Sequence, residues 1–66
     1  MDEAEYIALK AKFLKAFAGV PNPLRGEIVV VLSGESYNWS AANAEILNDT
    51  PIAKEIINQL KNMGVI

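Results

Sequence analysis

The chain has 66 residues and contains neither cysteine nor histidine, so it lacks the usual chemical means of stabilising so small a fold. A domain of this size buries only about 60% of the surface that its unfolded chain exposes. Small domains therefore depend on disulfides, a structural metal or association with another chain. The composition excludes disulfides and the usual zinc sites. Hydrophobic residues make up 52% of the chain, so we expect a second subunit, most simply in a homodimer, to cover part of this apolar surface.

The absence of histidine and cysteine also restricts the kinds of function that the chain can have. Histidine and cysteine supply most metal ligands and most nucleophile–base pairs, so we expect no cofactor and no metal, and we favour binding over catalysis. The net charge of −2 is unlike that of proteins that neutralise many phosphates, which makes nucleic acid an unfavoured partner. No apolar run is long enough to span a membrane and no signal-peptide pattern is present. We therefore expect a cytoplasmic protein of prokaryotic type.

The first segment, from about Asp2 to Ala18, has the composition of a helix, with acids at its start and lysines towards its end. Gly19 and Pro21 follow at positions typical of a helix end. The apolar residues of this helix form two stripes, which implies that it packs against one partner inside the subunit and a second one outside it. The stripes are Tyr6, Leu9, Phe13 and Phe17, and Ile7, Ala11, Leu14 and Ala18.

The middle of the chain predicts a β-hairpin. After the stiff connector Val20–Pro23, where the prolines prevent a helix from continuing, residues Glu27–Leu32 form an unbroken β-branched strand. Ser33–Ser36 predicts the turn, and Tyr37–Trp39 the return strand. A continuously apolar strand implies cover on both faces. Either helices cover both faces within one subunit, or the hairpins of two subunits pair into a four-stranded sheet.

Two further elements complete the chain. Ser40–Asn48 fits either a strand or a short helix capped by Ser40, and its three alanines favour the helix. The last element is an amphipathic helix capped by Asp49 or Thr50, with Pro51 at its first position. Gly64 ends this helix, and the two apolar residues that follow it can fold back onto the helix.

These elements predict a single α+β domain over residues 1–66, with the order α-β-β-α-α. The predicted core consists of Leu9, Phe13, Phe17, Ile28, Val30, Leu32, Trp39, Ile46, Ile56, Ile57 and Leu60.

Four residues are candidates for binding a partner. Tyr37 and Trp39 are of types favoured at binding hot spots, although a small protein also needs such bulk in its core. Lys10 interrupts the apolar arc of the first helix, where it could be a buried base, extend its stem along apolar surface, or pair with Glu3. Arg25, the one arginine, could bind an anion or pair with an acid across an interface.

The segments Ala44–Leu47 and Ile52–Ile66, separated by a short polar break, resemble the second and third helices of winged helix-turn-helix domains. The last seven residues, LKNMGVI, resemble the run that often ends the recognition helix. That resemblance covers about a third of the chain and implies DNA binding by the last helix. Our leading hypothesis is nevertheless a non-enzymatic protein-interaction module that acts as a homodimer. A helix-turn-helix DNA-binding protein is the first alternative, and a small-ligand binder or enzyme with a site at a dimer interface is the second.

Overall fold

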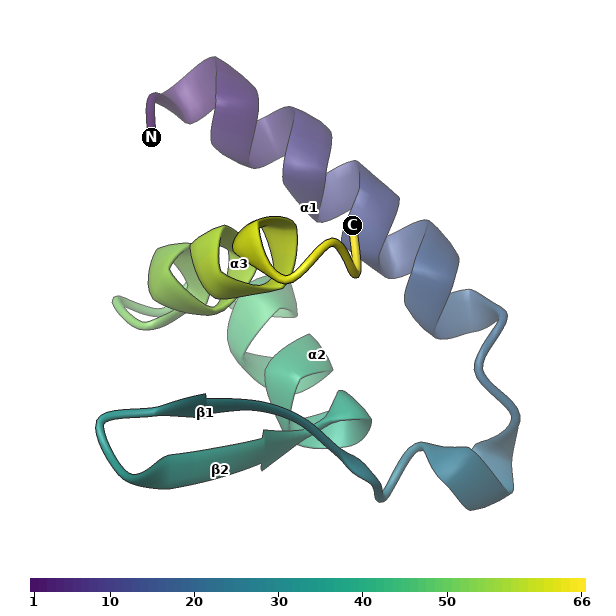
Figure 1. Cartoon of the computed structure of the whole chain (residues 1–66). Helices are drawn as coiled ribbons and strands as arrows, with labels where there is room; N and C mark the ends of the chain where they lie inside the picture. Colours follow the sequence, from purple (N-terminus) through teal and green to yellow (C-terminus); the bar gives the residue numbers. More distant parts are fainter.

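A computed structural model describes all 66 residues of the chain. Three helices pack above a two-stranded antiparallel hairpin, in the predicted α-β-β-α-α order (Figure 1). A short 3₁₀ helix, η1, interrupts the connector between the first helix and the hairpin. The elements are α1 (Glu3–Ala18), η1 (Asn22–Leu24), β1 (Ile28–Leu32), β2 (Glu35–Asn38), α2 (Trp39–Leu47) and α3 (Ala53–Asn62).

Helix α1 begins and ends as its sequence predicts. The side chain of Asp2 accepts a hydrogen bond from the backbone N–H of Glu5 at 2.7 Å, which satisfies one of the free donors of the first turn. The first apolar stripe faces the core, where Tyr6, Leu9 and Phe13 are buried. Most of the second stripe faces outwards, and Ile7 keeps 59% of its surface exposed, but Leu14 packs against the core.

The hairpin turn is tighter than expected. Only two residues connect the strands, and both Ser33 (φ 51°) and Gly34 (φ 80°) have the positive φ angles of the turn that matches the twist of a hairpin. β2 therefore starts at Glu35, inside the segment predicted to be the turn. It also ends before Trp39, which is the first residue of α2 rather than the last residue of a strand.

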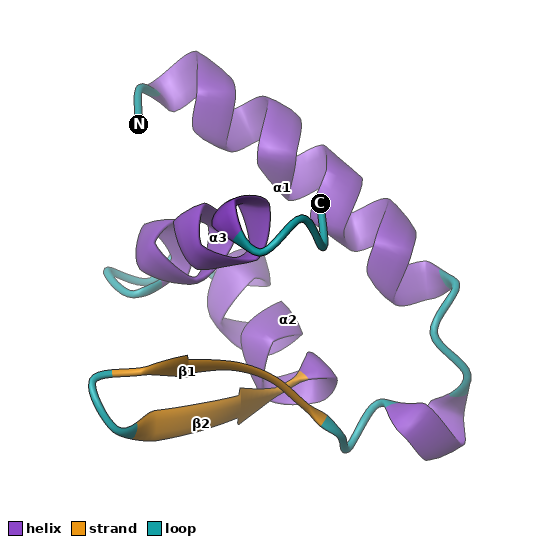
Figure 2. Ribbon diagram, viewed as in Figure 1, coloured by secondary structure: helices purple, strands orange, loops and turns teal.

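The helices cover only one face of the hairpin (Figure 2). Val30 is almost fully buried beneath them, whereas Ile28 and Val31 are 57% and 55% exposed on the outer side. The register of the strands slips between Ile28 and Val30, which is the signature of a β-bulge. The prediction of Ile28 as a core residue was wrong, and so was the alternative of helices on both faces within one subunit.

Helix α2 confirms the helical alternative for residues 40–48, but its cap lies two residues earlier than expected. Asn38, not Ser40, accepts the hydrogen bond from the N–H of Ala41 at 2.6 Å. Asparagine and serine cap about equally well, so the sequence left both positions open.

Helix α3 lacks the predicted side-chain cap, because it begins at Ala53 and neither Asp49 nor Thr50 caps it. Its end is as predicted. Gly64 has a φ of 77°. The N–H of Gly64 donates to the carbonyl of Lys61, and the N–H of Val65 donates to the carbonyl of Leu60. This pattern is the Schellman motif.

The core joins all three helices to the inner face of β1. Apart from Ile28, the predicted core residues are buried or are packed against the buried cluster. Phe17, Leu32 and Trp39 belong to the partly buried group. Three buried residues were not predicted: Tyr6, Ala42 and Ala53.

Candidate functional site

Lys10 lies in a polar cluster that fastens α1 to the turn between α2 and α3. Its ammonium group is 2.9 Å from Oδ1 of Asp49, and the hydroxyl of Tyr6 donates to the same oxygen at 2.7 Å. Asp49 adopts a φ of 48° in this turn, a left-handed conformation that aspartate tolerates better than most residues. Lys10 therefore pairs with a residue far along the chain, and the option of a local pair with Glu3 is not realised because Glu3 pairs with Lys54.

The cluster favours one protonation state of each member. Burial, followed by the hydrogen bond to the Asp49 carboxylate, raises the pKa of Tyr6 to about 12. The hydrogen bond from Lys10, followed by that from Tyr6, lowers the pKa of Asp49. At neutral pH the cluster thus holds a protonated phenol and an ionised carboxylate, an arrangement suited to holding α1 in place.

Arg25 binds the carboxyl-terminal end of α1. Its Nε and Nη2 atoms donate to the carbonyl oxygens of Val20 and Phe17 at 3.0 and 3.2 Å, and its guanidinium carbon lies 4.2 Å from the centre of the Phe17 ring. The Phe17 carbonyl also accepts from the backbone N–H of Val20 at 3.0 Å. Arg25 therefore adds a second donor to this carbonyl and links it to the carbonyl of Val20 beyond the end of α1. The contacts of its side chain are internal to the chain.

Trp39 is joined to Arg25 through two phenylalanines. The Phe13 ring stacks on Phe17, with a centroid distance of 6.2 Å, and on Trp39, with a centroid distance of 5.9 Å. Arg25, Phe17, Phe13 and Trp39 therefore form a continuous stack between α1 and the start of α2. Trp39 is half-buried in this stack, as the structural interpretation of its bulk expects.

Tyr37 lies apart from the other three candidates. It pairs with Val30 across the hairpin, is half-buried, and its hydroxyl makes no hydrogen bond within the chain. Partial burial, and then the carboxylates of Glu35, Glu45 and Glu55, raise the pKa of Tyr37. The surroundings of Tyr37 are therefore acidic. The structure brings Arg25 and Trp39 into one stack, but it does not bring the four candidates together into one site.

Both lysines of α3 are paired with acids at the start of α1. Lys54 lies 3.1 Å from a carboxylate oxygen of Glu3, and Lys61 lies 2.6 Å from one of Glu5. In a helix-turn-helix protein these lysines would be the phosphate contacts of the recognition helix. Here the nearby carboxylates compete for them and would repel phosphate.

The outer surface of the hairpin is the first of two surfaces that the contacts described above leave unused. Besides the exposed side chains of Ile28 and Val31, this surface includes a free strand edge, since β1 pairs with β2 alone. No backbone group of β1 bonds outside the hairpin. Edge strands are commonly protected by charged residues or proline, but β1 consists of IVVVL only.

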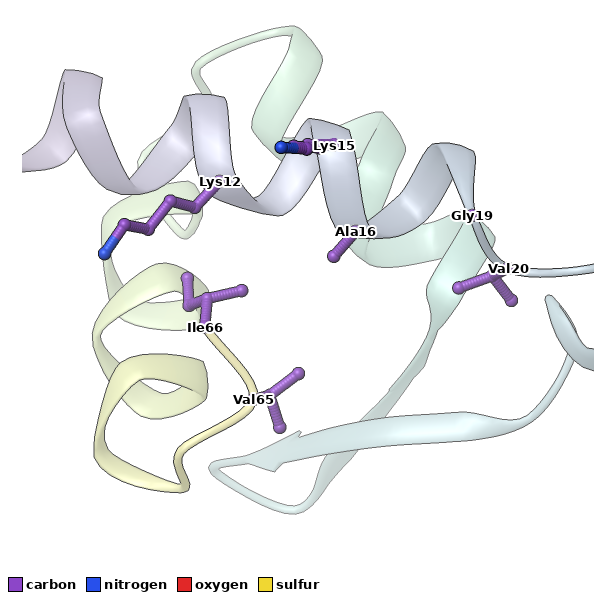
Figure 3. A pocket seen from close by; sticks show the side chains of 7 residues that line it. All are labelled: Lys12, Lys15, Ala16, Gly19, Val20, Val65 and Ile66. Atoms are coloured by element: carbon purple, nitrogen blue, oxygen red, sulfur yellow. The ribbon is translucent and has the colours of Figure 1, made fainter.

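The second unused surface is an open groove of about 520 Å³ between the carboxyl-terminal half of α1 and the end of the chain. In Figure 3, Ala16 and Val20 face Val65 and Ile66 across this hollow, and Lys12 extends from α1 beside Ile66. Lys15 also lines the hollow, and its side chain lies along α1 above it. Sequence reasoning missed the groove, because its two walls are more than 40 residues apart in the chain. A smaller hollow of about 210 Å³ lies beside Lys54, Glu55 and Asn58.

No group of three acidic side chains lies close enough together to hold a metal ion. The helices are all too short or too polar to cross a membrane. No protein-family model, curated protein or solved structure matches this chain.

Proposed function

We propose that this protein is a non-enzymatic protein-interaction module that acts as a homodimer, joined through β1. The observation that carries the proposal is the exposure of Ile28 and Val31 on a strand whose second edge has no partner. A two-stranded sheet is marginal in water. Pairing of β1 with its copy about a two-fold axis would give a four-stranded antiparallel sheet and place the apolar side chains of the two outer faces side by side.

A dimer of this kind requires a large part of the exposed surface. A stable interface of standard size buries about 800 Å² of each partner, which is about a fifth of the 3964 Å² that this chain exposes. The outer face of the hairpin would have to supply most of that area, together with η1 at its base, where Leu24 is 47% exposed. The bulge next to Ile28 favours regular pairing at the Val30–Leu32 end of the strand.

Catalysis is the weaker alternative. The side chains of Lys10 and Arg25, which could take part in acid–base or anion chemistry, make contacts that stabilise the fold. DNA binding is also weaker, since Lys54 and Lys61 are paired with carboxylates. We further propose a cytoplasmic, prokaryotic-type protein, an assignment supported by the absence of cysteine.

The test is the solution mass by light scattering over a range of concentrations, for the unmodified chain and two lysine variants. We expect a dimer that Val31→Lys converts to a monomer, because the substitution places two like charges in the paired edge. Ile7→Lys is the matched control, since Ile7 is exposed to a similar extent (59% against 55% for Val31) but lies on α1. A chain that stays monomeric at every concentration would refute the dimer, and dissociation by Ile7→Lys alone would place the interface on α1. Circular dichroism of both variants checks that they remain folded.

A further inference from the structure

Four of the six cationic side chains hold the fold together, and two are free. Lys10, Lys54 and Lys61 pair with carboxylates at 2.9, 3.1 and 2.6 Å, and Arg25 donates to two backbone carbonyls. The remaining two, Lys12 and Lys15, make no ion pair or hydrogen bond within the chain, and both line the 520 Å³ groove (Figure 3). The two lysines that make no ion pair therefore both lie beside one apolar hollow.

The groove has an apolar floor with a charged rim. Ala16 and Gly19 leave room on the side of α1, because their side chains are small or absent, and Val65 and Ile66 form the opposite wall. Ile66 also packs against the hydrophobic core, which fixes that wall. Lys12 and Lys15 are three residues apart on the helix, so they lie on neighbouring turns of one side of α1.

We propose that this groove binds an acidic peptide segment of a partner protein, with an apolar side chain seated between the two walls and carboxylates beside Lys12 and Lys15. Charge complementarity carries the choice of partner, because two uncompensated cations beside an apolar hollow favour an anionic and apolar ligand. The openness of the groove favours a peptide, since sites for small molecules enclose most of their ligand. This inference deepens the proposed interaction function by naming a partner class. It does not depend on the dimer, because no residue of β1 lines the groove.

The experiment measures fluorescence anisotropy of three labelled twelve-residue peptides titrated with the full chain. The first peptide alternates leucine with aspartate and glutamate, the second replaces its acids with lysine, and the third replaces its leucines with serine. We expect only the first peptide to bind, and its affinity to fall as salt is raised. If no binding occurs, or if the second or third peptide binds as well as the first, the proposal is refuted.

Variants of the full chain locate the site. We expect the double variant Lys12→Gln, Lys15→Gln to weaken binding by about fivefold to thirtyfold, as two exposed charge pairs predict. Asn58→Glu, Asn62→Glu is the control: it changes the net charge by the same amount at exposed positions of α3, and it should leave the affinity within about twofold, as overall charge alone predicts at moderate salt. Equal weakening by both variants would refute the groove as the site.

A third variant tests the hollow itself. Gly19 has a φ of −85°, and a β-carbon added there meets only the carbonyl of Ala16, at an ordinary contact distance of 3.5 Å. Gly19→Leu should therefore fold and fill the groove, abolishing peptide binding without changing the lysines. Unchanged binding would contradict the proposal.

Val31→Lys separates this inference from the dimer, since it should bind the first peptide as the unmodified chain does. If the chain is monomeric and still binds the peptide, only the proposed dimer is refuted. If the lysine-to-glutamine variant instead dissociates a dimer, the occupant of the groove is a second copy, and the proposal of a separate peptide partner is wrong.

Discussion

Removal of one hydroxyl group tests whether the cluster around Asp49 stabilises the fold. Tyr6→Phe keeps the buried ring and deletes only the donor that lies 2.7 Å from Asp49. A hydrogen bond to a charged acceptor contributes about 1.5–3 kcal/mol. Because the Asp49 side chain is 58% exposed, water replaces the lost donor, and we expect the lower end of that range, about 1.5 kcal/mol.

That loss is large for a chain of this size. A domain of this length has a free energy of unfolding of about 3–10 kcal/mol, so the variant loses a substantial fraction of it. The melting temperature should fall by about 10 °C. Urea unfolding at pH 7 and at one fixed protein concentration measures the change without interference from a shift in dimerisation.

The pH dependence of stability gives a second test of the same hydrogen bond. The pKa of Tyr6 is raised from 10.0 to about 12 in the folded chain, so its stabilising effect is complete below pH 10 and is lost as pH rises towards 12. Two pKa units correspond to about 2.7 kcal/mol, more than the 1.5 kcal/mol lost at neutral pH. The advantage of the unmodified chain over Tyr6→Phe should therefore vanish near pH 11. Tyr37, whose pKa is also raised, is present in both proteins, so its contribution cancels in the difference.

A double-mutant cycle that combines Tyr6→Phe with Asp49→Asn measures the coupling between these two side chains. Asparagine tolerates the positive φ at this position and can still accept through Oδ1 but carries no charge, so the cycle measures how much of the interaction depends on the charge of Asp49. We expect a coupling free energy of about 1 kcal/mol. A coupling below about 0.3 kcal/mol, or a stability difference between the unmodified chain and Tyr6→Phe that stays constant from pH 9 to pH 12, would show that this hydrogen bond does not stabilise the fold.

Two further substitutions test how helices end. Arg25→Lys should lower the free energy of unfolding by about 1–2 kcal/mol in urea titrations, because an ammonium cannot donate to two carbonyls in one plane while stacking on Phe17; no loss would mean that water satisfies these carbonyls equally well. Gly64→Ala should cost about 1 kcal/mol because of the positive φ of Gly64. Gly26→Ala, where φ is not positive and an added β-carbon meets nothing within 4 Å, should cost nothing, and equal effects of the two alanines would contradict the conformational explanation.

The sequence was most informative where the determinants of structure are local. Helical periodicity predicted the buried face of α1, and Gly64 with the residues after it predicted the Schellman motif. The errors at the hairpin are shifts of about two residues between alternatives of similar local energy. Ser33 is a less usual residue for a positive φ than asparagine, and Asn38 and Ser40 are equivalent as caps.

Contacts between distant residues could not be predicted in this way. Lys10 and Asp49 are 39 residues apart, and Lys61 and Glu5 are 56 residues apart. Nothing in the spacing of charges selects these pairs, because the packing of α1 on α3 determines which side chains meet. For the same reason the groove and the exposure of Ile28 became evident only from the fold.

Polar and aromatic contacts at both ends of α1 hold this helix in place as a wall of the groove. Its amino-terminal half is tied to α3 and to the turn before it, through Glu3, Glu5 and the Asp49 cluster. Its carboxyl-terminal end is tied by Arg25 and the aromatic stack. Each exposed ion pair contributes at most about 1 kcal/mol, but together these contacts hold α1 on both sides of the segment that lines the groove. A wall fixed at both ends loses little conformational freedom when a ligand binds, so the groove is preorganised for its peptide.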